Sequence, residues 1–392
     1  MTEPSIYLDS NATSQIHPRV VEAMMPYLTD QWHNPSSGYR AGQKVKASVE
    51  RAREQVADLI GAHPNEIVFT GCGTESNNMV IKSLARVIGR KKSRVVVSEI
   101  EHSAVLRPTE AMAAVGFDVE RVGVDSDCRL RLDHFADAVV DDRPGFASIM
   151  WANNETGVVQ PVAEAVEITK AAGWHFHTDA IQAVGKVPVR VDEVPVDFLS
   201  ISGHKFHAPK GVGALFIRKE SPFEPMIRGG GQESGHRSGT ENVPYIIGLG
   251  EAAAIMKSEM ENGGLDCVAA LRDRLQTGLS QRLDRVRCNT QPGSAPPCYT
   301  APNVAHLSFE GCVAAEMLPK LDAAGIQCSA GSACMTGKAG PSHVQKAMGF
   351  SDERAYSSLR LSLSIFTTEE EIDRAVDIIA EVARECCVEA VE

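Results

Sequence analysis

The segment Phe198-Leu199-Ser200-Ile201-Ser202-Gly203-His204-Lys205 decides the interpretation of the whole chain. Residues 198–201 form a short apolar run of the length of a buried strand, and a lysine follows after a few small residues. In open α/β sheets, side chains at this position face a ligand. Lys205 is therefore a candidate for a Schiff base, although most lysines are only solvated.

Apolar runs of similar length recur at residues 67–69, 95–97, 148–151 and 214–217. Between them lie segments with helical spacing of apolar residues, including 75–89 and 161–173, the second opened by a proline and closed by a glycine. Strands that alternate with helices form parallel sheets. The sequence therefore predicts an α/β fold.

A different pattern begins after about residue 250. Helical stretches at 251–261 and 271–283 precede a proline-rich stretch at 291–302, and a capping-box sequence at 367–371 opens a last helix. A chain of 392 residues is long for one core, since domains average about 150 residues. We expect a second domain in this part of the chain.

The charge balance excludes some classes of partner. The chain has 39 Lys and Arg against 51 Asp and Glu, a net charge of -12, which disfavours binding to the phosphates of a nucleic acid. No run reaches the roughly 18 apolar residues that a membrane span needs, and residues 1–14 do not resemble a secretion signal. We expect a cytoplasmic protein with neither a nucleic-acid nor a membrane partner.

A carboxylate and an amine are expected to meet at one edge of the sheet. Asp179 ends a short strand at residues 175–179, and Lys205 follows the next strand. Pyridoxal phosphate (PLP) requires this pair, because a lysine forms the Schiff base and an acid keeps the pyridine nitrogen protonated, so that the ring accepts carbanion charge. Together the two residues predict a PLP site.

The phosphate of such a cofactor needs hydrogen-bond donors. Residues 71–75, Gly-Cys-Gly-Thr-Glu, lie between a strand and a helix, where backbone N–H groups and the Thr74 hydroxyl can bind an anion, although a tight turn is the simpler interpretation. A dinucleotide fingerprint is only half matched, because Ser76 replaces its third glycine. His175, His177 and Asp179 alternate along one strand and could face a metal, which is a less favoured alternative.

Residues 328–337 indicate a mobile loop that carries a thiol, because they combine glycines and small side chains without an apolar period. Most cysteines in a chain of this kind are buried as small apolar groups, and Cys334 is the exception that we expect to react. At an ordinary pKa of about 8.5 little of this thiol is ionised at neutral pH, so attack requires a nearby base or positive field.

Taken together, the sequence resembles the cysteine desulfurases of the NifS/IscS type, within the fold-type I, class V aminotransferase-like PLP enzymes. The resemblance covers nearly the whole chain. Residues 207–211 and 151–154 are more similar to the NifS branch, which is associated with nitrogenase cluster assembly. The motifs that carry the resemblance lie at residues 7–13, 34–37, 73–76, 101–102, 153–157, 177–182, 202–205, 237–242, 331–334 and 360–364.

The resemblance implies two domains. A large PLP-binding domain at residues 16–259 would be built on a mostly parallel sheet. Residues 1–15 and 260–392 would form a smaller α+β domain, which carries the mobile catalytic cysteine loop at about residues 328–340.

The resemblance also implies the roles of individual residues. Lys205 carries the cofactor, Asp179 pairs with its pyridine nitrogen, and His102 stacks on its ring. Gln182 and Asn154 contact the ring oxygen and the substrate, and Arg360 binds the substrate carboxylate, a task suited to a guanidinium. The phosphate would be held by a set of small and polar residues: Gly73, Thr74, Ser202, Gly203, His204 and, from the neighbouring subunit of a homodimer, Thr240.

The implied reaction converts L-cysteine to L-alanine. Lys205 takes the Cα proton, the Cys334 thiolate attacks the substrate sulfur, and His102 donates or accepts a proton. The persulfide on Cys334 would then pass to an iron-sulfur scaffold or another acceptor, with a transient iron-sulfur contact at Cys334. Ala330 and Ser10 depart from the residues common in relatives, and neither position carries chemistry in this mechanism.

Two alternatives remain at this point. A selenocysteine lyase or another PLP-dependent lyase would keep Lys205 and Asp179 without depending on Cys334. A protein of another class, a cofactor-free scaffold, would use Cys328 and Cys334 to hold a metal or an iron-sulfur cluster.

Overall fold

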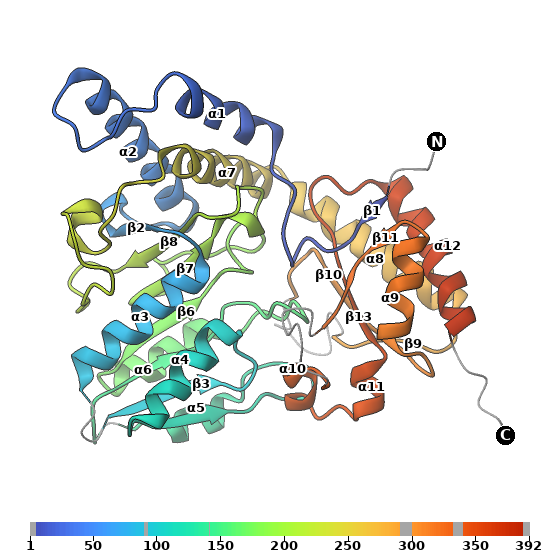
Figure 1. Ribbon diagram of the computed structural model, residues 1–392. Coiled ribbons are helices and arrows are strands. Elements are labelled where there is room, and N and C mark those ends of the chain that lie inside the picture. Colours follow the sequence, from blue (N-terminus) through green and yellow to red (C-terminus); the bar gives the residue numbers. More distant parts are fainter. Residues whose placement is uncertain (1–4, 90–92, 141, 291–299, 332–339, 387–392) are drawn as a thin grey trace.

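A seven-stranded sheet forms the larger part of the molecule. The computed structural model describes residues 5–89, 93–140, 142–290, 300–331 and 340–386 (Figure 1). The strand order is β2-β8-β7-β6-β5-β3-β4, with parallel pairing from β7 through β6, β5 and β3 to β4 and antiparallel pairing of β8 with both neighbours. The strands are β2 (Ile67–Thr70), β3 (Arg94–Ser98), β4 (Asp118–Val122), β5 (Gly145–Ser148), β6 (His175–Asp179), β7 (Phe198–Ser202) and β8 (Gly213–Ile217).

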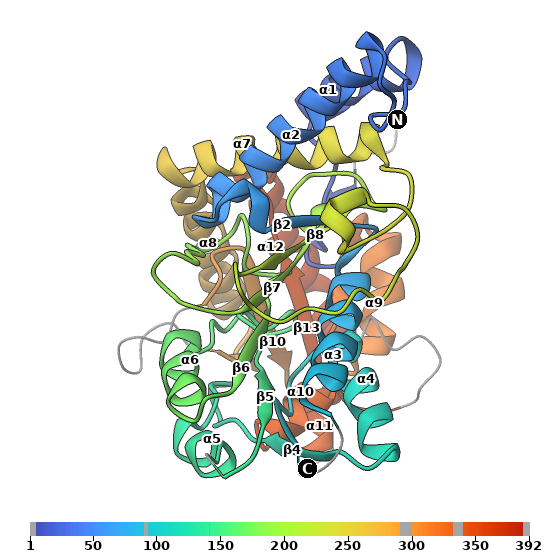
Figure 2. The same ribbon diagram turned by 90° about the vertical axis from the view of Figure 1, so that its left-hand side faces the viewer.

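Helices cover both faces of this sheet. In Figure 2, α3 (Gly73–Ile88) and α4 (Ser103–Ala114) lie on one side, and α5 (Leu132–Ala138) and α6 (Val162–Ala171) lie on the other. A further layer consists of α1 (Pro18–Thr29), α2 (Arg40–Ile60) and α7 (Val243–Glu261), which pack together. Short 3-10 turns occupy Pro64–Glu66, Gly203–Lys205 and Gln232–Gly235. This arrangement confirms the predicted α/β class with a mostly parallel sheet.

Most of the expected strands agree with the structure to within a residue or two, and one does not. The apolar run at 148–151 was expected to be a strand, but β5 covers Gly145–Ser148. The residues after β5 still run beside β6, because the backbone N–H groups of Ile149 and Trp151 donate to the carbonyls of His177 and Asp179 at 3.1 and 2.9 Å. Gly145 is the first residue of β5. A Cβ on this residue would lie 2.5 Å from the Trp174 ring, so the packing at this position requires a glycine.

A second, four-stranded antiparallel sheet has the order β12-β13-β10-β9 and its own apolar core. Its strands are β9 (Val286–Cys288), β10 (Val304–Phe309), β12 (Ser329–Ala330) and β13 (Ser358–Ser362), and the helices near it are α8 (Gly264–Arg282), α9 (Ala314–Ala323), α10 (His343–Ala347), α11 (Asp352–Tyr356) and α12 (Glu369–Cys386). The strand β1 (Ile6–Tyr7) pairs in parallel with β11 (Ile326–Gln327), which brings the start of the chain to this part.

The helices near the end of the chain match their sequence signals in part. The capping box of α12 is formed, since the Thr368 backbone N–H donates to Glu371 and the Glu371 N–H donates to the Thr368 hydroxyl. The stretches expected at 251–261 and 271–283 belong to longer helices, α7 and α8, which begin at Val243 and Gly264. Since α7 packs on α1 and α2 while α8 packs on α12, the chain passes between the two parts near residue 262. The exact domain boundaries, at 15/16 and 259/260, stay predictions.

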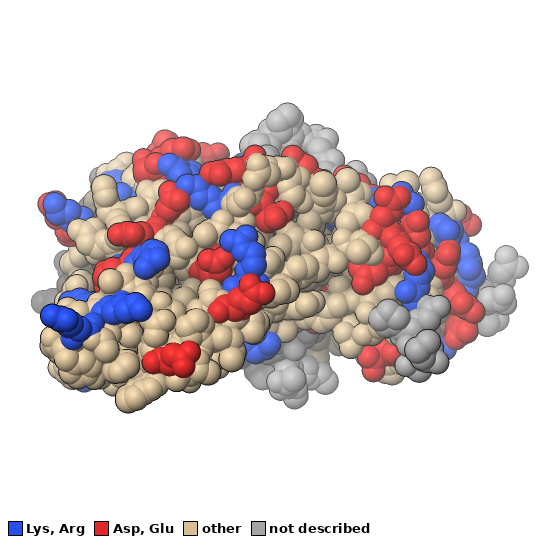
Figure 3. Space-filling view, turned by 90° about the horizontal axis from the view of Figure 1, so that it is seen from above, with Lys and Arg blue, Asp and Glu red and all other residues tan. Residues whose placement is uncertain are grey.

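The surface mixes both signs of charge. On the face shown in Figure 3, acidic and basic side chains are interspersed rather than gathered into one basic area. Among the helices of the described ranges, none combines the length and the apolar composition that crossing a bilayer requires.

Candidate active site

One cavity of about 270 Å³ collects most of the side chains singled out in the sequence. Five loops reach it from the carboxyl ends of β2, β3, β5, β6 and β7, and two segments reach it from the second sheet and the N-terminal stretch. The predicted residues that line it are Gly73, Thr74, His102, Asn154, Asp179, Gln182, Ser202, His204, Lys205 and Arg360. The cavity therefore lies where open α/β sheets bind ligands.

Asp179 and Lys205 come from neighbouring parallel strands, as expected. Asp179 ends β6, and its carboxylate accepts hydrogen bonds from Asn77 Nδ2 at 2.7 Å and from the Ile181 backbone N–H at 3.0 Å. Burial raises the pKa of Asp179, while the positive charge of Lys205 is among the influences that lower it. A protonated ring nitrogen placed against this carboxylate would favour its ionised form, so the site fits a pyridinium.

The Lys205 amine is held by backbone carbonyls. Its Nζ donates to the carbonyl oxygens of Asn11 and Ala12 at 2.7 and 2.8 Å. Both acceptors belong to the N-terminal stretch, which lies against the 3-10 turn that follows β7. The amine thus has a fixed position in the cavity.

The N-terminus of α3 reaches the cavity where the sequence predicted an anion site. Gly73 opens the helix, and a Cβ at this residue would lie 2.1 Å from Ile181 Cδ1 and 3.2 Å from Ser202 Cβ. Gly203 is equally confined, since its Cβ would lie 2.9 Å from Ala208 Cβ. Gly73 lets the start of α3 approach Ile181 after β6 and Ser202 of β7, so that the backbone N–H groups of α3, which carry the positive end of the helix dipole, face the cavity.

His204 is a neutral donor near this helix end. Burial, followed by the charge of Lys205, lowers the pKa of His204 to about 4. Its Nδ1 lies 3.2 Å from the Thr13 hydroxyl oxygen. A neutral imidazole in this position can donate one hydrogen bond to a phosphate, together with Thr74 and Ser202, which line the same cavity.

His102 is the N-cap of α4. Its Nδ1 accepts a hydrogen bond from the Ala104 backbone N–H at 3.1 Å, which leaves Nε2 as the nitrogen that carries the proton of the neutral ring. This cap fixes the ring orientation at the edge of the cavity, where a stacking role requires it.

Arg360 reaches the cavity from β13 and is held by two acceptors. Its Nη2 lies 2.7 Å from Asp9 Oδ1, and its Nη1 donates to the Asn154 carbonyl at 3.0 Å. The Arg360 side chain is only 2% exposed, and its Nε has no hydrogen-bond partner among the described residues. A buried cation with an unused donor suits a carboxylate ligand.

Several residues of the cavity escaped the sequence analysis. Asn11, Asn77 and Cys72 all contribute: Asn11 and Cys72 line the cavity, and Asn77 binds Asp179. The sequence contains two signals for these residues. Asn11 and Cys72 lie within the motifs at residues 7–13 and 71–75, and Asn77 lies one helical turn after Gly73. The Asn11-Ala12-Thr13 stretch matches a glycosylation sequon. However, Asn11 is only 2% exposed, its backbone N–H donates to the Ser362 hydroxyl, and its Nδ2 donates to the Asn154 carbonyl.

Two of the expected residues that the structure describes, Gly203 and Thr240, do not line this cavity. Cys334 lies outside the described residues, as do 332–339 in general. Within the segment expected as a loop, at about 328–340, Ser329 and Ala330 pair with β13 as strand β12. Thr240 is exposed and does not line the cavity.

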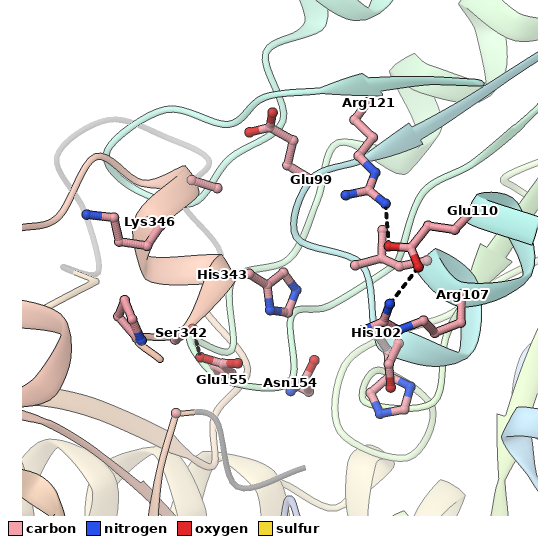
Figure 4. Close-up of a pocket in the computed structure, with 15 residues that line it drawn as sticks. Glu99, His102, Arg107, Glu110, Arg121, Asn154, Glu155, Ser342, His343 and Lys346 are labelled. Carbon is pink, nitrogen blue, oxygen red and sulfur yellow. Dashed lines mark hydrogen bonds and ion pairs between the residues drawn. The ribbon is translucent and has the colours of Figure 1, made fainter. Parts of the chain in front are cut away.

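A second cavity, of about 570 Å³, adjoins the first and shares His102 and Asn154 with it (Figure 4). The Ser342 hydroxyl donates to Glu155 Oε2 at 2.5 Å on one side, and Glu110 bridges Arg107 and Arg121 on the other. Gly331 and Pro341 both line this cavity. The described chain on both sides of residues 332–339 therefore reaches this cavity.

The metal alternatives find no support in the described part of the chain. Both ring nitrogens of His177 are used, by Ser148 and Ser200 at 2.8 and 3.0 Å, and burial lowers the pKa of His177 to about 3. Burial, with Asp9 nearby, raises the pKa of Cys328 to about 12, which disfavours the thiolate that a metal requires. Within the described ranges, no group of three or more His, Cys, Asp or Glu side chains could hold a metal.

A lysine amine, a buried carboxylate and a helix N-terminus at the carboxyl edge of a mostly parallel sheet define the class of fold-type I PLP enzymes. Comparison with known proteins gives the family. The model of the family "Aminotransferase class-V" matches residues 6–375, so the chain belongs to the class-V aminotransferase family.

Individual relatives agree with this assignment. "Cysteine desulfurase NifS" of Azotobacter vinelandii is 42% identical over 372 residues, which are 95% of this chain and 90% of that protein. "Cysteine desulfurase IscS" of Methanosarcina thermophila is 41% identical over 380 residues, 97% of this chain and 92% of that protein. A solved structure described as "NIFS-LIKE PROTEIN" has a TM-score of 0.89 and 36% identity, and the match covers 97% of this chain and 100% of that chain. The expected family, fold class and PLP dependence are confirmed.

Proposed function

We propose that the protein is a cysteine desulfurase that converts L-cysteine to L-alanine and receives the sulfur on Cys334. The observation that carries this proposal is the meeting of Lys205, Asp179 and Arg360 in one cavity of a class-V aminotransferase. Relatives that bear the name cysteine desulfurase support the same activity. When bound, PLP supplies a ring that withdraws negative charge from the substrate Cα.

The residues of the cavity divide the remaining work. Arg360 binds the substrate carboxylate and fixes which substituent of Cα faces the amine. Lys205 Nζ takes the proton from Cα, and His102 exchanges a proton through Nε2. Asp179 keeps a negative charge against the ring nitrogen.

The sulfur step requires a nucleophile from the segment 332–339. Its flanking residues, Gly331 and Pro341, line the cavity that shares His102 and Asn154 with the cofactor site, which supports access of Cys334 to the substrate. The Cys334 thiolate forms an S–S bond to the substrate sulfur as the C–S bond breaks. The electron pair of that bond stays on the substrate Cβ, which takes a proton, and Lys205 returns a proton to Cα, so that the product is L-alanine.

The test measures alanine and sulfide released from L-cysteine by the holoenzyme and by Cys334→Ala, with the exposed Cys267→Ala as a matched control. We expect the Cys334 variant to lose nearly all activity and the control to keep it. Full alanine production by Cys334→Ala would refute the persulfide mechanism and favour a PLP lyase that does not use a cysteine, such as a selenocysteine lyase. A colourless protein that reacts with no carbonyl reagent would instead favour the scaffold alternative.

We further propose a homodimer with shared sites, an iron-sulfur scaffold or another protein as sulfur acceptor, and a cytoplasmic location. Thr240 is exposed and does not line the cavity of its own chain, which is consistent with a residue that serves a second copy. Met25, Leu28 and Trp32 expose 46, 53 and 71% of their surface, which fits a covered face. Donation to iron-sulfur clusters related to nitrogenase, and the division into a large domain at 16–259 and a small domain formed by 1–15 and 260–392, belong to the same proposal.

Mixing two inactive variants tests the shared site. Lys205→Ala and Thr240→Ala subunits, unfolded and refolded together, should regain cofactor binding in the mixed dimer, because one site then has both intact residues. No gain over the separate variants, or a monomer in sedimentation, would contradict the shared site.

A further inference from the structure

Lys186 is a buried amine for which the mechanism above has no use. The residue is 7% exposed, and its Nζ donates to Asn11 Oδ1 at 3.0 Å and to Gln182 Oε1 at 2.5 Å. Both acceptors are uncharged amide oxygens. Burial and the nearby charges of Lys205 and Arg360 hold the pKa of Lys186 well below its ordinary value. Burying an amine without a carboxylate partner costs stability, so we looked for a role of Lys186 in the neighbouring cavity.

The two amides that Lys186 binds have only one possible orientation. Gln182 Nε2 donates to the Asn11 backbone carbonyl at 2.9 Å, so Oε1 must be the atom that faces Lys186. Asn11 Nδ2 donates to the Asn154 carbonyl at 3.1 Å, so Oδ1 of Asn11 must also face Lys186. Because backbone carbonyls cannot donate, both assignments follow from the network itself.

The same atoms lie next to the reacting amine. The Asn11 carbonyl that accepts from Gln182 also accepts from Lys205 Nζ at 2.7 Å. Gln182 and Asn11 both line the cofactor cavity, and Gln182 Nε2 has a second N–H besides the one that Asn11 uses. Lys186 therefore lies one hydrogen bond behind two residues of the cavity.

We propose that Lys186 is a positioning residue, which holds Gln182 with an amide N–H directed into the cofactor cavity and holds Asn11 as the acceptor for Lys205. This inference rests on the proposed PLP site. It gives Lys186 an indirect role, through Gln182 and Asn11, in setting the electronic state of the bound cofactor. A lysine suits this task because in either charge state it has two N–H groups for two carbonyl-type oxygens.

The test uses the visible spectrum of the bound cofactor in the holoenzyme. Lys186→Met removes both donors and keeps the apolar stem, and Lys257→Met, which removes a surface lysine paired with Asp58, is the matched control. An N–H donor to the ring oxygen favours the deprotonated chromophore. We therefore expect the pH midpoint of the chromophore to rise by about one unit in Lys186→Met and to stay unchanged in the control.

A double-mutant cycle separates positioning from a general loss of structure. If Lys186 acts through Gln182, its substitution should shift the chromophore midpoint in the wild-type background and have little further effect in a Gln182→Met background. Equal shifts in both backgrounds, or a Lys186→Met midpoint identical to that of the wild type, would overturn the proposal. If Lys186→Met does not fold, Gln182→Glu serves instead, because its carboxylate keeps the partner of Lys186 and has no N–H for the cavity. Its midpoint should then rise, and an unchanged midpoint overturns the inference.

The failure of this inference differs from the failure of the proposed function. Borohydride reduction of the wild-type holoenzyme should bleach the chromophore and label Lys205. If no chromophore forms, the PLP site itself is wrong. If the chromophore forms, is labelled at Lys205 and does not respond to Lys186→Met or Gln182→Glu, only the role of Lys186 is wrong.

Discussion

Substitution of Glu101 by glutamine should remove a pH-dependent loss of stability. Glu101 is fully buried, and its Oε1 accepts hydrogen bonds from the Ser98 hydroxyl at 2.6 Å and from the Met150 N–H at 2.7 Å. Its Oε2 has no partner among the described residues. Burial is the main cause that raises the pKa of Glu101 to about 8 from an ordinary 4.5, and the charge of Asp179 adds to it. The folded protein therefore keeps this carboxyl protonated at neutral pH.

The sign and size of the effect follow from the two pKa values. Below pH 4.5 the carboxyl is protonated in both the folded and the unfolded chain, and folding is not opposed by its ionisation. As the pH rises toward 8, only the unfolded chain releases the proton. The free energy of unfolding therefore falls by up to about 1.4 kcal/mol per pH unit. Glutamine mimics the protonated carboxyl and does not titrate. Near pH 8 the variant should exceed the wild type by about 2 to 5 kcal/mol, and near pH 5 the two should be similar.

The assay is urea unfolding of the cofactor-free wild type and Glu101→Gln at several pH values between 5 and 8. Other groups titrate equally in both proteins, so they cancel in the difference. Glu99→Gln, an exposed neighbour, is the control and should show no such trend. A difference between Glu101→Gln and wild type that is the same at pH 5 and pH 8 would refute the buried, protonated state of Glu101.

Three further outcomes test other parts of the structure. Asp9→Asn removes the charge that holds Arg360 at 2.7 Å and should raise the KM for L-cysteine about tenfold in steady-state assays, whereas a KM within twofold of the wild type would contradict the role of the pair. Glu233→Gln breaks a buried contact in which Arg53 donates to both carboxylate oxygens at 2.7 and 2.9 Å, and should cost about 3 to 5 kcal/mol in urea unfolding. Thr368→Ala removes the cap of α12 and should cost about 1 kcal/mol, with activity retained.

The sequence predicted the elements whose signals are local. The strand at 198–201, the acid at the end of 175–179 and the capping box at 367–371 each depend on a few neighbouring residues, and the structure has all three. The strand expected at 148–151 was wrong in its bounds, because the mostly apolar run at 146–151 continues past the end of β5, although the N–H groups of Ile149 and Trp151 still donate to the carbonyls of His177 and Asp179.

The supports of the site were not predictable in this way. Lys186 meets Asn11 across 175 positions of sequence, and Arg360 meets Asp9 across 351. Nothing in the local pattern around Lys186 distinguishes it from a solvated lysine. Its contacts depend on the fold, which places Asn11 beside Gln182 and so orients the amide oxygens that Lys186 binds. Resemblance to a family indicated most of the residues that line the cavity, whereas the residues behind them follow only from the three-dimensional structure.

The N-terminal stretch has a consequence for the order in which a new chain matures. Residues 9–13 leave the ribosome well before their partners Lys186, Lys205, Asn303 and Arg360. During synthesis the large sheet can form while its cavity still lacks one wall. The cavity therefore acquires all of its described walls only after Arg360 has been made.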